Sequence, residues 1–156
     1  PWDRPDMALF LFTKAILASE AIDLYNQGDM VRDFTYIDDI VEGLFRIVKN
    51  VPEPDPEWSG DTPNPASSSA PYRLYNIGSN SPVPLMDYVR EIEKNLGMEA
   101  KLNLMPMQDG DVRKSHADVE NLIKVFDYAP KWNIKDGIKN FIQWYVDYYK
   151  VSLPTR

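Results

Sequence analysis

The sequence contains no cysteine and only one histidine, His116. Disulfide bonds and thiolate metal sites are therefore excluded. A metal site needs several converging ligands, and Ser115, Ala117 and Asp118 supply no such set around the histidine. We expect His116 to be a core or solvent-facing residue, with no metal bound, and the lack of cysteine fits a reducing cytoplasm.

Glycine is scarce as well. The seven glycines are nowhere arranged as Gly-x-Gly-x-x-Gly, the turn that a dinucleotide fold places between a strand and a helix. The sequence therefore predicts that these residues contain no cofactor-binding site.

Long apolar runs and basic stripes are also missing. No apolar segment approaches the length of a membrane span, and residues 1–4 have neither the basic region nor the apolar core of a signal sequence. The formal net charge is −7, with 17 Lys and Arg against 24 Asp and Glu. We expect neither a membrane nor nucleic acid as partner, and a bound anion would need a local basic cluster.

The residues that are present suffice for a hydrophobic core, since 44% of them are hydrophobic. Helical and strand periodicities both occur, which predicts an α/β fold. We expect one domain over residues 1–150, with a frayed tail at 151–156. Six prolines between 51 and 71 predict a long surface loop there. Helices are expected at 6–17, with Asp6 as its cap, and at 36–50, 84–96, 119–126 and 135–149; strands are expected at 22–25, 30–34, 73–77 and 101–105.

The segment from Gly28 to Asp39 contains the most specific local pattern. Thr35 and Asp38 have the spacing of a capping box, and an apolar helix face follows them. The pair Asp38 and Asp39 is explained by this helix start and not by an acid–base dyad. Arg32 has no helical partner, and its planar fork suits a phosphate or a carboxylate. The alternative is a structural ion pair with Asp29, Asp33 or Asp39.

Several separate motifs together carry a family resemblance. They are Arg32-Asp33-Phe34-Thr35-Tyr36-Ile37-Asp38-Asp39-Ile40-Val41-Glu42-Gly43 and the segments 1–8, 64–72 and 107–112. From Pro1 to Tyr149 the chain resembles the carboxyl-terminal half of an extended short-chain dehydrogenase/reductase, and is most similar to the UDP-glucuronate 4-epimerases. The start at Pro1, without methionine, fits the same interpretation of a fragment.

This resemblance implies a small substrate-binding lobe of about four helices and four or more short strands, packed against a Rossmann lobe that is absent here. The intact enzyme would use NAD to invert C4 of UDP-glucuronate, giving UDP-galacturonate. The superfamily's Tyr-x-x-x-Lys pair does not occur in this sequence, so we expect no catalytic residue here. Alone, the chain should bind no NAD and be inactive. A homodimer is a possible assembly.

The resemblance also assigns substrate contacts. Arg32 matches the arginine that contacts the diphosphate, Tyr25 the aromatic residue near the uracil, and Asp111 the acid that accepts a hydrogen bond from the ribose. Gln108 lies where galactose epimerases carry a phosphate-binding arginine. The alternatives are a core role for Tyr25, a turn or cap role for Asp111 and a solvated surface position for Gln108.

Arg4 resembles a clamp for the sugar carboxylate, which would restrain a β-keto acid intermediate from losing carbon dioxide. The family usually has glycine before this arginine, whereas Asp3 stands here and could compete for the guanidinium.

Two other functions stay open: a related UDP-sugar epimerase, dehydratase or decarboxylase, and a non-enzymatic binding domain. A lobe without its partner should also expose an apolar surface near Met7 to Phe12, which would self-associate.

Overall fold

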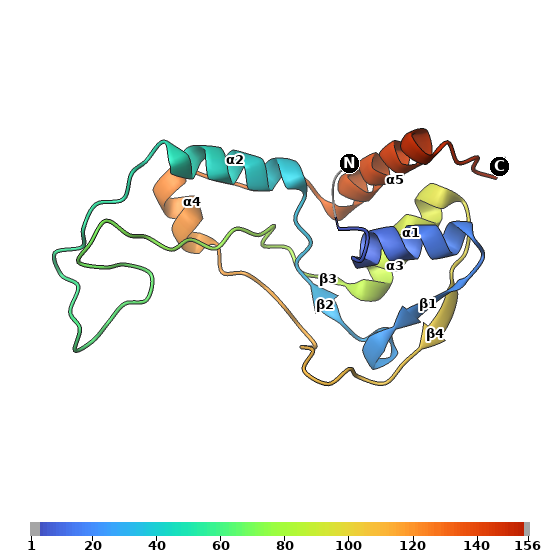
Figure 1. Cartoon of the computed structure of the whole chain (residues 1–156), viewed down its shortest axis with the longest axis horizontal. Coiled ribbons are helices and arrows are strands. Elements are labelled where there is room, and N and C mark those ends of the chain that lie inside the picture. Colours follow the sequence, from blue (N-terminus) through green and yellow to red (C-terminus); the bar gives the residue numbers. More distant parts are fainter. Residues whose placement is uncertain (1–3, 155–156) are drawn as a thin grey trace.

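The computed structural model describes residues 4–154, in which helices and short strands alternate (Figure 1). In chain order the elements are α1 (Ala8–Leu17), β1 (Ala21–Leu24), the 3₁₀ helix η1 (Tyr25–Gly28), β2 (Val31–Arg32), α2 (Ile37–Val48), β3 (Val83–Pro84), α3 (Leu85–Leu96), β4 (Lys101–Leu104), α4 (Glu120–Phe126) and α5 (Ile134–Tyr149). None of the helices in this described range has the length and hydropathy needed to cross a membrane.

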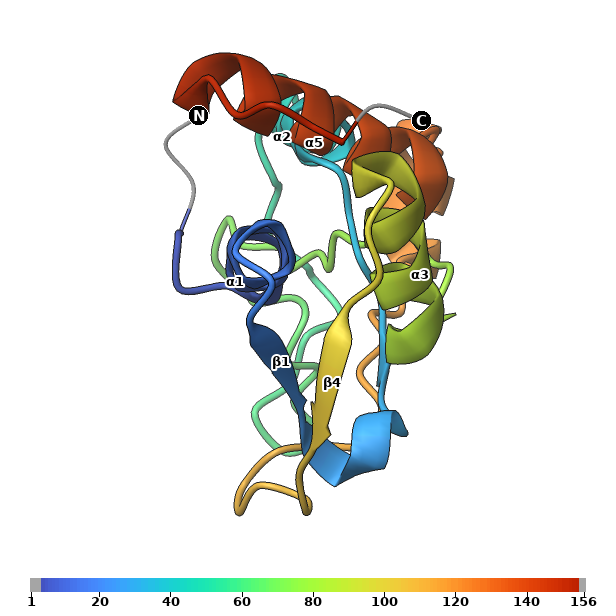
Figure 2. The same cartoon turned by 90° about the vertical axis from the view of Figure 1, so that its right-hand side faces the viewer.

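Two strands and three helices form what we call the main core: β1, β4, α1, α3 and α5. β1 pairs with β4 in parallel, from Ala21 opposite Lys101 to Leu24 opposite Leu104. Figure 2 shows α1 beside α3, with α5 across the top of both and the strands below. The buried apolar side chains come from β1 and the three helices: Phe12, Ile16, Ile22, Leu24, Val89, Ile92, Leu96, Ile138 and Ile142.

The helices of the main core follow the predicted periodicity closely. α3 places Tyr88, Val89, Ile92 and Leu96 in the core, as their spacing indicates. It ends at Gly97, which has φ = 68°. Glycine adopts this left-handed conformation without the steric cost that a Cβ imposes, so the predicted helix end is confirmed.

A second region, which we call the arm, comprises α2, α4, the loop 49–78 and Tyr128, which follows α4. The arm extends away from the main core (Figure 1). The arm has a small apolar centre, where Ile77 and Tyr128 pack so closely on Gly43 that a Cβ at that position would lie 3.4 Å from each of them. Residues 51–71 contain no helix and no strand longer than an isolated bridge, as the prolines predict. The single domain expected over 1–150 remains a prediction.

The predicted capping box is wrong. α2 begins at Ile37 with Tyr36 in the N-cap position, and no side chain makes a capping hydrogen bond there. The start of the helix is held instead by Asp39, which is buried and accepts hydrogen bonds from distant backbone amides. A long-range contact therefore replaces the local cap that Thr35 and Asp38 could have formed.

Asp6 is likewise not the cap of the first helix. α1 begins at Ala8 after Met7, without a capping hydrogen bond. The carboxylate of Asp6 pairs with the Arg4 guanidinium at 2.7 Å. A charged partner two residues away competes with the weaker bond to a helix amide.

The strand predicted at 73–77 is also wrong, and the one at 30–34 is shorter than expected. β2 contains only Val31 and Arg32 and pairs antiparallel with β3. Residues 73–77 form only an isolated bridge, between Arg73 and Ser67. A strand requires a neighbour along its length, and the described residues supply none for this segment.

The apolar surface expected near Met7 to Phe12 is only partly present. Met7 and Leu11 are about half exposed, whereas Phe10 and Phe12 are buried. Phe10 packs edge-on against Phe141 of α5, with ring centroids 4.9 Å apart. The largest stripe of exposed apolar side chains lies elsewhere, on α2.

Candidate functional site

Arg32 lies on β2, between the arm and the main core (Figure 1). One of its terminal nitrogens donates to Asp111 Oδ1 at 2.9 Å. The other donates to the carbonyls of Val31 at 3.0 Å and Arg113 at 3.3 Å. The side chains of Arg32 and Asp111 are 25% and 34% exposed, so the pair is partly accessible to solvent. These hydrogen bonds hold the planar guanidinium in one orientation.

The loop that carries Asp111 is attached to β2 by backbone hydrogen bonds. Val31 N donates to Arg113 O at 2.9 Å, and Ser115 N donates to Val31 O at 3.1 Å. Before it, Asp111 N donates to Gln108 O at 3.2 Å and closes a turn. Gly110 takes φ = 81° in this turn, a conformation that favours glycine. The fold therefore fixes the acid next to the arginine.

The alternative partners considered for Arg32 are all engaged elsewhere. Asp29 pairs with Arg113 at 2.7 Å. Asp33 accepts hydrogen bonds from the Ser79 hydroxyl and from two backbone amides of the same turn. Asp39 binds the backbone before α5. The alternative of a structural ion pair with Asp29, Asp33 or Asp39 is thus wrong, and Arg32 pairs with Asp111, which lies 79 positions away.

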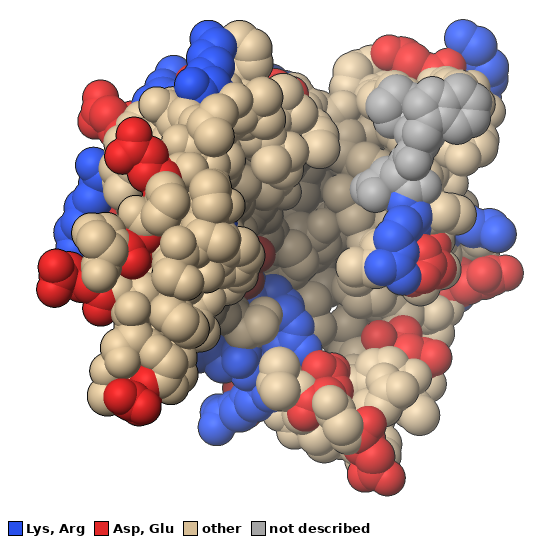
Figure 3. Space-filling view, turned by 60° about the vertical axis from the view of Figure 1, so that its left-hand side comes forward, with Lys and Arg blue, Asp and Glu red and all other residues tan. Residues whose placement is uncertain are grey.

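Further positive charge follows directly in the chain at Arg113 and Lys114. Both residues are exposed, and Lys114 forms an isolated parallel bridge with Val31 of β2. Arg32, Arg113 and Lys114 thus bring three positive charges to β2 and the loop beside it, of which two are paired, with Asp111 and Asp29. Figure 3 shows a hollow between two parts of the surface, with Lys or Arg side chains gathered at its lower end.

Arg113 is a residue that the sequence analysis missed. It is two positions after Asp111, a spacing that puts alternate side chains of an extended segment on one face. That spacing was the available signal, but it could not reveal the attachment of this segment to β2.

Tyr25 and Gln108 lie at the ends of neighbouring elements. Tyr25 follows β1 as the first residue of η1 and is 37% exposed. η1 is attached beside β4, because Gln27 N donates to Met105 O at 2.9 Å. Gln108 is exposed in the turn before Asp111. Within the described part of the chain, no hydrogen bond connects the side chain of Tyr25 or Gln108 to the Arg32–Asp111 pair.

Arg4 precedes α1 and is largely exposed, in an ion pair with Asp6. The hydrogen bond from Arg4 lowers the pKa of the Asp6 carboxyl below its ordinary value. The competition expected from Asp3 falls outside the described residues. The structure thus places Arg4 in a different cluster from Arg32.

A shallow pocket of about 400 Å³ lies around Asp33, and its lining includes Asn76, Ser115 and His116. His116 is exposed, and its Nε2 is 2.9 Å from Asn80 Oδ1. This placement agrees with the predicted solvent-facing histidine. Residues 4–154 hold no group of three or more His, Cys, Asp or Glu side chains that could bind a metal ion.

The described residues do not fit a dinucleotide. In a dinucleotide fold a glycine-rich turn connects a strand to the N-terminus of a helix, where the pyrophosphate binds. Here β3 leads directly into α3 through Pro84. β1 leads into η1, whose Asn26 and Gln27 have positive φ, and then into β2. The connection from β2 to α2, residues 33–36, contains no glycine either. None of these three connections has the glycine-rich turn.

Comparisons with known proteins identify the family and the relatives of this chain. The NAD dependent epimerase/dehydratase family matches residues 1–78, which is half of the 156-residue chain. Protein CapI of Staphylococcus aureus is 55% identical over 150 residues, covering 96% of this chain and 45% of that protein. A probable UDP-glucuronate 4-epimerase of Rhizobium meliloti is 41% identical over 159 residues, covering 99% and 46%. The chain therefore spans less than half the length of these relatives.

A solved structure of UDP-glucuronic acid 4-epimerase from Bacillus cereus, in complex with NAD, has the same fold over 96% of this chain and 41% of its own. The TM-score is 0.73 and the sequence identity is 24%. The likeness confirms the predicted α/β fold as part of a larger one. Given the family match and the two relatives at 55% and 41% identity, this chain belongs to the NAD dependent epimerase/dehydratase family.

Proposed function

We propose that this chain is the substrate-binding part of an NAD-dependent epimerase that inverts C4 of UDP-glucuronate, giving UDP-galacturonate. The names of the relatives support this enzyme class. In this proposal, NAD is held by a part of the enzyme that these 156 residues do not contain. The chain alone then binds no NAD and turns over no substrate.

The observation that carries the proposal is the Arg32–Asp111 pair at 2.9 Å. A nucleoside diphosphate needs a cation for its phosphates and an acceptor for its ribose hydroxyls. The guanidinium and the carboxylate supply both, side by side and partly exposed. Each charge-assisted hydrogen bond from Arg32 contributes about 1.5–3 kcal/mol. Lys114 adds positive charge next to this pair, whereas Arg113 is itself paired with Asp29.

The other substrate contacts are assigned from the places of the residues in the fold. Tyr25 contacts the uracil from the end of β1, and Gln108 lies beside Asp111 at the phosphates. Because these contacts hold the UDP and not the sugar, the hexuronic acid is free to turn over between oxidation and reduction. Arg4 restrains the sugar carboxylate, after exchanging Asp6 for the substrate. A bidentate contact of this kind keeps the carboxylate from rotating out of the plane of the neighbouring ketone.

Titration of the 156-residue chain with UDP, followed by the backbone amide signals in NMR spectra, tests the binding site. We expect the signals of Arg32, Asp111 and Arg113 to shift. Arg32→Ala should weaken UDP binding about 10- to 100-fold, the loss of one charge-assisted contact. Arg32→Lys keeps the charge but not the fork, and should give an intermediate loss. Arg90→Ala, at an exposed ion pair on α3, is the control.

Titrations with other ligands test which part of the ligand each arginine contacts. Uridine lacks the phosphates, so its weaker binding should not respond to Arg32→Ala. UDP-glucuronate should bind more tightly than UDP-glucose, and Arg4→Ala should remove that difference. Equal UDP affinity in the unmodified chain and Arg32→Ala would overturn the assignment of the site, and an unchanged preference for glucuronate in Arg4→Ala would overturn the clamp.

A further inference from the structure

A second ion pair lies next to the Arg32–Asp111 pair. A terminal nitrogen of Arg113 is 2.7 Å from Asp29 Oδ2, and the two side chains are 70% and 60% exposed. The side chains of Arg32 and Asp111 are less accessible, at 25% and 34%. An exposed ion pair stabilises a protein little, because water screens the charges and two long side chains must be held in one geometry. Arg113 can therefore exchange Asp29 for another anion with little loss of stability.

The backbones on both sides of this second pair are fixed. The carbonyl of Arg113 accepts hydrogen bonds from Val31 N at 2.9 Å and from the Arg32 guanidinium at 3.3 Å. Asp29 N donates to Asn26 O at 2.9 Å, and Asn26 Nδ2 donates to Asp29 O at 2.7 Å. The side chain of Arg113 thus begins beside the Arg32 guanidinium, and it can change its partner without a movement of the loop.

The charges around Arg32 nearly cancel in the free protein. Asp111 opposes Arg32, and Asp29 opposes Arg113. A diphosphate carries negative charge on both phosphates, and carboxylates close to it repel it. Binding a diphosphate beside Arg32 is therefore favoured when a second cation is released from its acid.

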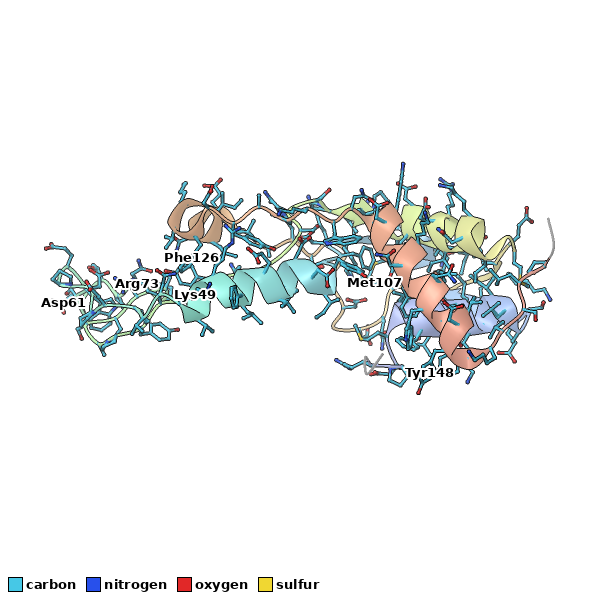
Figure 4. All side chains as sticks on the ribbon, turned by 90° about the horizontal axis from the view of Figure 1, so that it is seen from above. Lys49, Asp61, Arg73, Met107, Phe126 and Tyr148 are labelled. Atoms are coloured by element: carbon cyan, nitrogen blue, oxygen red, sulfur yellow. The ribbon has the colours of Figure 1, made fainter. Side chains whose placement is uncertain are left out.

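Arg113 is the cation best suited to this second contact. Gln108, which the proposed function also places at the phosphates, is neutral. Figure 4 shows Arg73 far along the arm, whereas Met107, which directly precedes Gln108, lies beside the main core. The planar guanidinium of Arg113 can donate a bidentate pair of hydrogen bonds to a phosphate, which the ammonium of Lys114 cannot.

We propose that Arg113 is a second phosphate-binding residue, and that Asp29 competes with the phosphates for its guanidinium. In the free protein Arg113 binds Asp29, and in the complex it binds the diphosphate beside Arg32. Asp29 thus lowers the affinity of the site for the nucleotide. This inference deepens the proposed function and rests on it, because the diphosphate is that of the UDP-sugar.

Titrations of the 156-residue chain with UDP test this exchange of partners. Asp29→Asn removes the competing charge and should tighten UDP binding about two- to fivefold, the equivalent of one exposed ion pair. Arg113→Ala should weaken UDP binding about tenfold, because a charge-assisted contact is lost. Uridine has no phosphate and should bind both variants as tightly as the unmodified chain. Weaker UDP binding by Asp29→Asn would show that Asp29 orients Arg113 for the ligand, and would overturn the competition.

The double variant separates competition from simple repulsion. If Asp29 acts through Arg113, Asp29→Asn should improve UDP binding much less when Arg113 is already alanine. An equal improvement in both backgrounds would mean that the carboxylate only repels the phosphates, and the exchange would be wrong. Arg90 and Asp87 form an ion pair on α3 with side chains that are 71% and 55% exposed. Arg90→Ala and Asp87→Asn are the matched controls for the change in net charge, and should leave UDP binding unaltered.

The failure of this inference and that of the proposed function give different results. Weaker UDP binding by Arg32→Ala, with none by Arg113→Ala, would keep the nucleotide site and overturn the role of Arg113. A larger loss from Lys114→Ala than from Arg113→Ala would also overturn that role. A chain that binds no UDP would overturn both proposals. In NMR spectra, the Nε–H signal of Arg113 should shift with UDP and not with uridine, and a signal that UDP leaves in place would contradict the exchange.

Discussion

α2 and α3 are helices of equal length, 12 residues each, and use their apolar residues in opposite ways. α3 buries Tyr88, Val89, Ile92 and Leu96 in the main core. α2 buries Asp39 and Gly43 and leaves most of its large apolar side chains exposed: Ile37, Val41, Leu44, Phe45 and Val48. The comparison teaches that an amphipathic pattern predicts a helix but not which of its faces is covered. In the main core, packing among neighbours stabilises the helices; in the arm, the apolar stripe contributes little until something covers it.

The largest expected difference between the two regions is in the free energy of unfolding that is lost when an isoleucine is replaced by alanine. Ile92 of α3 is fully buried, whereas Ile37 of α2 is 61% exposed. Ile92→Ala should lower the free energy of unfolding by about 2–5 kcal/mol, because it removes buried methylene groups and leaves a cavity. Ile37→Ala should change it by less than about 0.5 kcal/mol. Urea unfolding of the two variants measures both values, and comparable losses would show that the α2 stripe is already buried.

A smaller effect is expected where the arm joins the main core. The buried Asp39 carboxylate accepts hydrogen bonds from Lys131 N at 2.9 Å and Trp132 N at 3.1 Å, just before α5. Asp39→Asn keeps the shape but loses the charge and one acceptor oxygen. We expect a loss of about 1.5–3 kcal/mol in the free energy of unfolding.

Its neighbour provides the control. Asp38 is exposed in the same helical turn, and Asp38→Asn should cost less than about 0.5 kcal/mol. The variants are compared by thermal unfolding. If the Asp38 variant loses as much as the Asp39 variant, the helix dipole and not the link to residues 131 and 132 stabilises the start of α2.

The sequence predicted the features that depend on neighbouring residues. The periodicity of α3, the glycine at its end and the strand at Lys101–Leu104 are local and were found, although β4 is exposed on both faces and does not alternate in burial. The link from Asp39 to residues 131 and 132 spans more than 90 positions and has no local signal. The capping box was therefore preferred wrongly. Similarly, residues 73–77 have a strand pattern, but a strand also requires a neighbour, which lies beyond any local pattern.

The same distinction applies to the candidate site. From the residues alone, Arg32 was an unpaired cation with three nearby acids as possible partners. Asp111 lies 79 positions away, and only the family resemblance assigned it to the same ligand. Arg113 was missed, because its proximity to β2 depends on backbone hydrogen bonds that periodicity cannot reveal. The nucleotide contacts themselves stay a prediction.

The smallest effect concerns a polar atom inside the arm. The Tyr128 side chain is fully buried, and its hydroxyl has no hydrogen-bond partner among the described residues. Leaving a buried hydroxyl unpaired is unfavourable. Tyr128→Phe should therefore raise the free energy of unfolding by about 1 kcal/mol and the Tm by about 2–4 °C. A lower Tm at neutral pH would show that the hydroxyl is paired.

The pH dependence provides an independent check on the same residue. Burial, and then the nearby Asp39 charge, raise the pKa of Tyr128 above its ordinary value of 10.0. The unfolded chain then loses this proton at a lower pH than the folded one, so the stability is present below pH 10 and is lost as the pH rises toward the folded pKa. Burial also raises the pKa of Tyr145, on α5 in the main core. Tyr128→Phe should therefore reduce, but not abolish, the loss of stability between neutral and strongly alkaline pH. If Tyr128→Phe leaves the alkaline pH dependence of the free energy of unfolding unchanged, the loss of stability arises from Tyr145 in the main core.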